Sequence, residues 1–210
     1  MHGMEIKDRF RKFLPVVVDL ETAGFNEHTD ALLEVSMVML KMDAAGVLLP
    51  DEQLSANIRP FPGANLEKPN LDFLGIDPFD ESRRLLTEQE ALPPMFKAVS
   101  RAIRRHSCTR AVLVGHNGFF DLKFLLAAAA RIGYRRCPFH PFSVLDTATL
   151  SSLMFGHSVL VRACRAAGIA FDDEQAHGAV YDAAREAELF CAIYNRYTIH
   201  AGIPGPLADE

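Results

Sequence analysis

Two acidic side chains, Asp19 and Glu21, directly follow the apolar residues 16–18 (VVV). Positions i and i+2 of a strand project from the same face, so the two carboxylates would lie side by side. Carboxylates held so close repel each other unless a cation lies between them, and such oxygen ligands suit Mg²⁺ or Mn²⁺ rather than zinc or copper. Taken alone, D-x-E is a weak signal, and a solvated strand end explains the pair more simply.

A third acid ends the motif HNGFFD, which places Asp121 in the first turn of a helix that follows a strand. The ends of strands and the starts of helices are where α/β proteins place their chemistry. An acid at this position also has a purely structural role, because it favours the positive end of its own helix. Asp121 by itself therefore leaves both interpretations open.

The motif HGAVYD supplies a fourth acid, Asp182, with His177 five positions before it. Five helical residues turn the chain by about 140°, so the two side chains share a site only if His177 lies in the loop before the helix. Histidine is the natural general base near neutral pH, and an entry loop would let it reach an attacking water. The alternative is an exposed residue at a helix end.

Length and composition describe an ordinary globular protein of 210 residues, 49% hydrophobic and 23% charged, for which we expect a single domain over 1–210. The net charge of −5 argues against a protein that binds polyanions by bulk charge. The four cysteines form no C-x-x-C pair, which excludes a zinc-finger or thioredoxin-like site and favours reduced thiols. Because the sequence has neither an apolar leader nor a run near ~18 apolar residues, we expect a cytoplasmic protein without membrane association.

The pattern of apolar runs predicts an α/β domain, whose strands and helices must position these residues. Short apolar runs predict strands at 16–20, 31–41 and 53–60 in antiparallel succession, with a turn at 43–46. Further strands are expected at 111–117 and 142–146, and helices within 65–78 and over 94–106, 119–133, 147–155, 158–167 and 178–199. We expect the helix at 94–106 to begin only at Pro94, because two prolines interrupt the chain there. The alternation predicts a mixed central sheet with helices on both faces.

Together, the order of D-x-E, H-N-x-x-x-D and H-x-x-x-x-D resembles the DEDDh 3′–5′ exonuclease family, from residue 16 to about 190. The ending T-A-G-F of the first motif, the long 43–106 stretch and the segments CPFHPF and FDDEQAH resemble an RNA-trimming branch of that family. The resemblance implies an RNase H-like fold and a hydrolase, a 3′–5′ exoribonuclease. It would trim the 3′ ends of tRNA, rRNA precursors and other stable RNAs and release nucleoside 5′-monophosphates.

The same resemblance implies a role for each acidic residue. Two Mg²⁺ ions, with Mn²⁺ as the alternative, would be held by Asp19, Glu21, Asp121 and Asp182. In this arrangement Asp19 bridges both ions, and Asp121 holds one of them through water. His177 would be the general base.

Nucleic-acid contacts are also implied by position within the family motifs. The residues that resemble base-stacking phenylalanines are Phe25, Phe73, Phe120 and Phe142, whereas we expect Phe119 to face the core. The residues that resemble the family branch's RNA-binding patch are Arg9, Arg11, Arg104, Arg110 and Arg135. In that branch the patch serves the active site of a second subunit, so the resemblance implies a homodimer.

Three other functions would fit parts of the pattern. A proofreading exonuclease for single-stranded DNA, or an oligoribonuclease-type enzyme, shares the chemistry but not the insert or the CPFHPF segment. A nucleic-acid-binding module without catalysis would not need all five catalytic residues. A structural α/β protein with chance acids explains none of the spacing.

Overall fold

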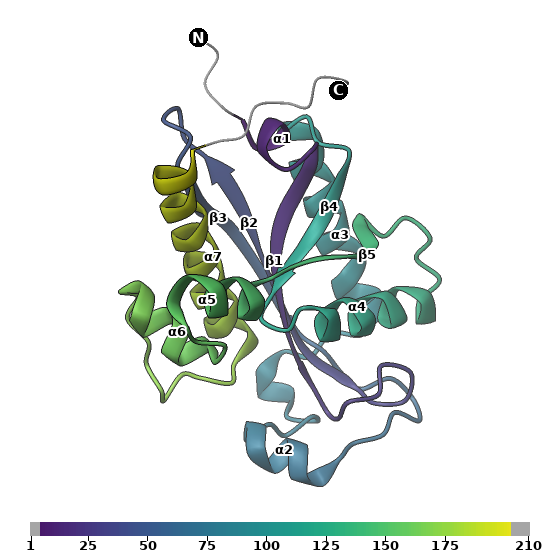
Figure 1. Ribbon diagram of the computed structural model, residues 1–210. Coiled ribbons are helices and arrows are strands. Elements are labelled where there is room, and N and C mark those ends of the chain that lie inside the picture. The colour runs from purple at the N-terminus through teal and green to yellow at the C-terminus, as the bar shows by residue number, and fades with distance from the viewer. Residues whose placement is uncertain (1–4, 203–210) are drawn as a thin grey trace.

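The computed structural model describes residues 5–202, and within them the strands form one five-stranded mixed sheet with the order β3-β2-β1-β4-β5 (Figure 1). The strands are β1 (Phe13–Thr22), β2 (Leu32–Met42), β3 (Leu48–Asn57), β4 (Arg110–Gly115) and β5 (Phe139–Asp146). β1, β2 and β3 pair antiparallel, whereas β4 lies parallel to both β1 and β5. The predicted mixed sheet, with an antiparallel half followed by parallel strands, is confirmed.

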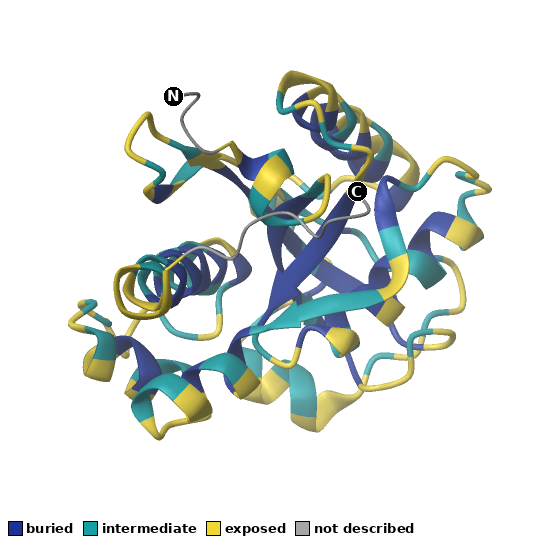
Figure 2. Ribbon diagram, turned by 45° about the horizontal axis from the view of Figure 1, so that its top comes forward, coloured by how far each residue is buried: buried dark blue, intermediate teal, exposed yellow. Residues whose placement is uncertain are grey.

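Helices cover both faces of this sheet. They are α1 (Ile6–Arg9), α2 (Lys68–Leu74), α3 (Glu88–Arg105), α4 (Phe119–Arg131), α5 (Thr147–Phe155), α6 (Leu160–Ala167) and α7 (Ala179–Ala201), with a 3₁₀ turn η1 (Glu81–Arg83). α7 packs across β1, β2 and β3 on one face, where α5 and α6 join it, and α3 and α4 pack on the other (Figure 1). The central strands are therefore buried on both sides, and exposed residues lie on the outer helix faces and loops (Figure 2).

β1 explains where the polar residues appear. Residues Leu14 to Val18 are fully buried apolar residues or proline, and β1 pairs with β4 only as far as Val17. Beyond that point β1 continues beside β2 alone, so Asp19 and Glu21 lie past the carboxyl end of the parallel pair. This edge of an α/β sheet is where sites are usually built.

The helix expected over 94–106 is longer than predicted, because α3 begins at Glu88. A capping box starts it: Thr87 Oγ1 accepts a hydrogen bond from the backbone N–H of Glu90, and the Glu90 carboxylate accepts one from the N–H of Thr87. The favourable cap is strong enough to start the helix ahead of the two prolines.

Pro93 and Pro94 therefore lie inside α3. Each removes the N–H that would bond to the carbonyl four residues earlier, here of Gln89 and Glu90. Both of these residues are exposed, so water can satisfy their carbonyls. The expectation of a helix break at the prolines was wrong for this reason.

The segment between β3 and α3 packs below the end of β1. Its apolar residues Leu71, Leu74 and Ile76 join Ala23 and Leu33 in a small core of their own. The side chain of Asn70 also donates a hydrogen bond to the carbonyl of Thr22. These contacts fix α2, which carries Phe73, beside the acidic end of β1.

The third strand lies closer to the N-terminus than expected, and the other strand boundaries differ from expectation by at most three residues. The third strand occupies Leu48–Asn57 rather than 53–60, because Asp43 accepts two backbone hydrogen bonds that close a tight turn and let pairing with β2 start at Leu48.

Among residues 5–202, no helix is both long and apolar enough to cross a membrane.

Candidate active site

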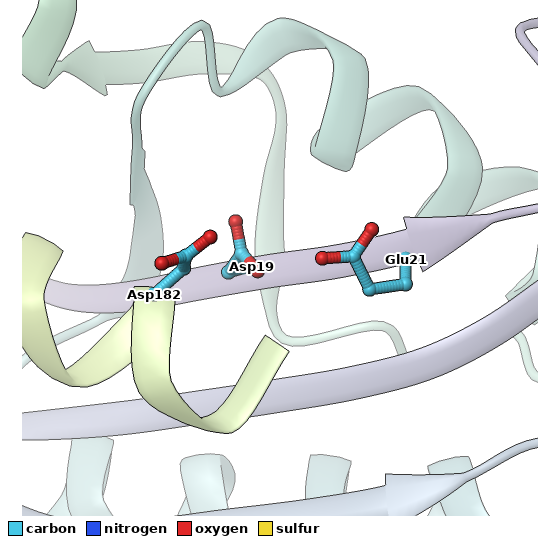
Figure 3. A group of neighbouring side chains, drawn as sticks. All are labelled: Asp19, Glu21 and Asp182. Atoms are coloured by element: carbon cyan, nitrogen blue, oxygen red, sulfur yellow. The ribbon is translucent and has the colours of Figure 1, made fainter. Parts of the chain in front are cut away.

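Three of the predicted acids converge where β1 meets the first turn of α7. One carboxylate oxygen from each of Asp19, Glu21 and Asp182 lies within 4.8 Å of the other two. Figure 3 shows Asp19 and Glu21 on the same face of β1, with Asp182 projecting toward them from the helix. The i, i+2 spacing read from the sequence is thus realised, and a third carboxylate completes one side of a compact oxygen cluster.

This cluster fits a divalent cation. Asp19 Oδ2 and Asp182 Oδ1 are buried and have no hydrogen-bond partner in the described chain. Buried polar atoms are normally paired, so two orphaned anionic oxygens in one cluster indicate that a cation balances them. An all-oxygen donor set suits Mg²⁺ or Mn²⁺.

The electrostatics of the site agree with this interpretation. Burial raises the pKa of Asp19 well above its usual range, and the carboxylates of Glu186 and Asp121 raise it further. Burial raises the pKa of Glu21 to about 8, with Glu34 as the next cause, and the pKa of Asp121 to about 7. These shifts describe carboxylates that are difficult to ionise together without a positive charge.

Asp121 lies next to the cluster but outside its compact group of three. It is only 5% exposed, in the first turn of α4, and its Oδ1 accepts a hydrogen bond of 3.1 Å from the backbone N–H of Leu20. Leu20 lies between Asp19 and Glu21 on β1, so this bond ties α4 to the strand that carries them. The structure therefore brings all four predicted acids to one end of the sheet.

A fifth acid, Glu186, was missed from the sequence. It is 2% exposed and lies one turn after Asp182 on α7. Its Oε1 accepts a hydrogen bond of 3.2 Å from the N–H of His116, and its Oε2 is buried without a partner in the described residues. The i, i+4 spacing from Asp182 was the signal that could have identified it.

His177 lies just before α7, as its spacing from Asp182 requires. Its φ is +65°, an unusual value for a residue other than glycine, and its backbone N–H donates a hydrogen bond of 3.1 Å to Asp182 Oδ2. The side chain is exposed, with its ring centroid 4.6 Å from that of Phe73. The imidazole is thus held beside the acidic cluster while open to solvent.

The predicted aromatic residues fall into two groups. Phe25 is 75% exposed directly after β1, and its ring centroid is 6.2 Å from that of the half-buried Phe120. Phe73 is also exposed at the site, whereas Phe142 is exposed on β5 beside His140. Phe119, which we expected in the core, is 52% exposed, because α4 begins with this residue and turns Phe120 inward against Phe124.

The predicted basic residues gather at the opposite end of β1. Arg110 pairs with Phe13 at the start of β4, and the N–H of Thr109 donates to the carbonyl of Lys12, so the start of β1 adjoins the end of α3. Residues 13–19 of β1 separate this patch from Asp19 by about 20 Å. The predicted residues that are exposed are Arg11, Arg104, Arg110 and Arg135.

Arg9 differs from the other arginines of the patch. Its guanidinium carbon lies 5.6 Å from the ring centroid of Tyr194 and 6.0 Å from that of Tyr197. It therefore packs on the aromatic residues of α7 and is only half exposed.

Residues 16–190 match the family model of the RNase_T exonuclease domain. The chain belongs to the ribonuclease T family of exonucleases. It is thus a hydrolase by family, and the matched range contains all five residues of the predicted catalytic set.

Curated relatives of the family are similar over nearly the whole chain. Ribonuclease T of Hahella chejuensis is 55% identical over 189 residues, which cover 90% of this chain and 87% of the relative. Ribonuclease T of Escherichia coli is 51% identical over 203 residues, which cover 97% of this chain and 94% of the relative.

Solved structures confirm the RNase H-like exonuclease fold. E. coli Exonuclease I in complex with a dT13 oligonucleotide gives a TM-score of 0.63 at 16% identity, covering 89% of this chain and 42% of that one. The nuclease domain of 3′hExo, a DEDDh family member bound to rAMP, gives 0.55 at 15% identity, covering 92% and 96%.

The buried acids of this family member predict how its stability depends on pH. The pKa values of Glu21 and Asp121 are raised in the folded protein. At a pH between the unfolded and the folded values, the folded protein therefore keeps carboxyl protons that the unfolded chain has lost. Their contribution to stability is complete below about pH 4 and is lost as the pH rises through about 7 to 8. In EDTA, the melting temperature should therefore fall between about pH 5 and about pH 8, by on the order of 10 °C.

Thermal unfolding followed by circular dichroism measures this effect. Mg²⁺ should restore the melting temperature more at the higher pH, because ionised carboxylates bind it better. The variant Glu21→Gln should show a smaller fall than the unaltered protein. A melting temperature in EDTA that is equal at both pH values would contradict this account.

Proposed function

We propose that this member of the ribonuclease T family is a 3′–5′ exoribonuclease that trims the 3′ ends of tRNA, rRNA precursors and other stable RNAs. It would release nucleoside 5′-monophosphates by metal-assisted hydrolysis. The observation that carries the proposal is the cluster of buried, unpartnered carboxylate oxygens at the end of β1 in a chain of this family. We further propose that the whole chain, 1–210, is one catalytic domain, and that it works in the cytoplasm, where its four free cysteines would remain reduced.

The acidic residues would bind two Mg²⁺ ions, with Mn²⁺ as the alternative. Asp19 would contact both, Glu21 and Asp182 would complete one position, and Asp121 would hold the other through water. When bound, such ions lower the pKa of an attacking water and offset the charge that develops on the leaving 3′ oxygen. The carboxylates themselves would carry out no proton transfer.

His177 would accept the proton of the attacking water as a general base. Its exposed ring can reach solvent, and its backbone bond to Asp182 keeps it beside the cluster. The neighbouring Phe73 ring restricts where the imidazole can turn. A histidine with these two restraints can stay close to the reacting water through successive cleavages.

Exposed aromatic rings would bind the unpaired 3′-terminal bases. Phe25 and Phe120 form an edge-to-face pair at the acidic end of β1, and Phe73 packs against the ring of His177. Stacking on such rings tolerates any base and contributes about 1–3 kcal/mol per base. Phe142, exposed on β5, would extend this surface.

The basic patch would bind the body of the RNA, and we propose that it does so across a homodimer. The patch and the acidic cluster lie at opposite ends of β1, about 20 Å apart, so a short 3′ tail in one subunit's site does not reach that subunit's own patch. A second copy would bring its patch to this site. Arg9, packed on Tyr194 and Tyr197, would take part less directly than Arg11, Arg104, Arg110 and Arg135.

The double variant Arg104→Ala, Arg110→Ala tests the role of this patch. We expect turnover of tRNA to fall at least ~10-fold, because phosphate contacts dominate affinity for long substrates, and turnover of a dinucleotide to change less than ~2-fold. The matched control is Arg165→Ala, an exposed arginine on α6 that is paired with Asp173. Equal losses on both substrates, or a monomer in sedimentation at assay concentration, would count against the dimeric arrangement.

The proposed activity is tested with a tRNA labelled at its 3′ end. Mg²⁺ should cause release of labelled nucleoside 5′-monophosphate, and EDTA should stop it. The same assay on single-stranded DNA separates the alternative, because a clear preference for DNA would favour a proofreading-type exonuclease. Binding of either substrate without any release would show a nucleic-acid-binding module instead.

A further inference from the structure

One acid near the site, Glu34 on β2, accepts a hydrogen bond with each of its carboxylate oxygens. It lies directly opposite Glu21 in the antiparallel register of β1 and β2. Its Oε1 accepts a hydrogen bond of 2.6 Å from Arg83 Nη2, and its Oε2 accepts one of 3.2 Å from the backbone N–H of Ala179. Glu34 therefore differs from Asp19 and Asp182, whose buried oxygens include unpartnered ones, and it has another role.

Arg83 is itself fixed on several sides. It belongs to η1, its side chain is 16% exposed, and that of Glu34 is 17% exposed. Arg83 Nη1 donates to the carbonyl of Asp77 at 3.2 Å, and the Arg83 carbonyl accepts from Asn57 Nδ2 at 2.6 Å. A charge-assisted bond between partly buried and well-held partners is stronger and more directional than an exposed ion pair.

The hydrogen bonds of Glu34 link Arg83 to the start of α7. Ala179 is the first residue of that helix, and Gly178, which precedes it, offers no side-chain cap. Glu34 supplies from β2 the acceptor and the negative charge that a helix start favours. The capping function is thus provided by a distant residue, oriented by an arginine of the insert.

The loop held in this way contains His177. The left-handed backbone conformation of His177 costs free energy, so it persists only when contacts from neighbouring residues enforce it. Two bonds flank the residue: its own N–H to Asp182, and the N–H of Ala179 to Glu34. The Arg83–Glu34 pair thus contributes one of the restraints on this loop, together with the bond to Asp182 and the Phe73 ring.

We propose that Arg83 and Glu34 are positioning residues for His177: the arginine orients the Glu34 carboxylate, and the carboxylate holds the N–H of Ala179, so that the imidazole faces the acidic cluster. The proposal rests on the general-base role proposed for His177. It also gives the segment between β3 and α3 a function besides carrying Phe73, because η1 supplies the arginine.

The test uses Arg83→Met with Arg59→Met as its matched control. Arg59 also pairs with η1, through an exposed bond of 2.8 Å to Glu81, and within residues 5–202 it forms no hydrogen bond or ion pair with Glu34 or α7. We expect Arg83→Met to lower kcat on a dinucleotide ~10-fold with little change in KM. Hydrogen exchange of the amides at 177–179 should become ~10-fold faster, because one hydrogen bond of about 1.4 kcal/mol is weakened. The control should leave both quantities within ~2-fold.

Two further variants keep the test decisive if Arg83→Met is poorly folded. Arg83→Lys, which keeps the charge, should recover part of kcat, and Glu34→Gln should raise amide exchange at 177–179 without weakening Mn²⁺ binding. If His177→Ala itself leaves hydrolysis intact, the proposed role of His177 fails. If His177→Ala is inactive but the Arg83 and Glu34 variants change neither kcat nor exchange, the positioning role alone is overturned.

Discussion

Asp19→Asn is expected to reduce hydrolysis of a 3′-labelled RNA by at least ~10³-fold while the protein remains folded. Asp19 is central to the acidic cluster, and one of its buried oxygens has no partner within the described residues. Asparagine preserves the shape but removes the charge that would balance two divalent ions. Because burial and four neighbouring carboxylates disfavour the ionised Asp19, the variant should be at least as stable as the unaltered protein in EDTA.

Single-turnover kinetics with excess enzyme measure this loss, and circular dichroism checks the fold. The matched control is Asp51→Asn, which removes a carboxylate from β3 that pairs with Lys41 and Arg105 away from the site. Asp182→Ala should lose hydrolysis of the RNA to the same extent as Asp19→Asn. Retained turnover in either purified variant would show that these acids do not hold the catalytic ions.

The second large effect is expected for His177→Ala, in which kcat should fall by about 10²- to 10⁴-fold. The side chain is exposed, so its removal should leave the melting temperature nearly unchanged.

Mn²⁺ binding separates this variant from the acidic ones. His177→Ala should bind Mn²⁺ with unaltered stoichiometry, whereas Asp19→Asn should lose at least one site, as measured by calorimetry. His200→Ala, an exposed change in the last turn of the same helix, serves as the control and should retain full activity. A His177→Ala enzyme with normal kcat would exclude the histidine as the base.

The sequence was sufficient where chemistry depends on local spacing. The i, i+2 pair on β1, and the five-residue offset that places His177 before α7, follow from strand and helix geometry alone. The antiparallel half of the sheet, β1 to β3, also followed from the succession of apolar runs. These features can be predicted without knowing which residues distant in the sequence lie in contact.

Other features depended on contacts that spacing does not reveal. Glu34 lies opposite Glu21 only because of the β1–β2 register, and Arg83 reaches it only because the insert folds under β1. α3 runs through two prolines because a capping box precedes them and the affected carbonyls face water. Phe119 was assigned to the core because the predicted start of the helix, although correct, does not show which face of α4 packs on the sheet.

The central claim is that the acids at the end of β1 hold two divalent ions, and anomalous diffraction from crystals soaked in Mn²⁺ tests it most directly. We expect two peaks. One would be bounded by Asp19, Glu21 and Asp182, the other would lie between Asp19 and Asp121, and both would be absent from Asp19→Asn crystals. No peak at this end of the sheet in the unaltered protein, with Mn²⁺ bound elsewhere or not at all, would contradict the account.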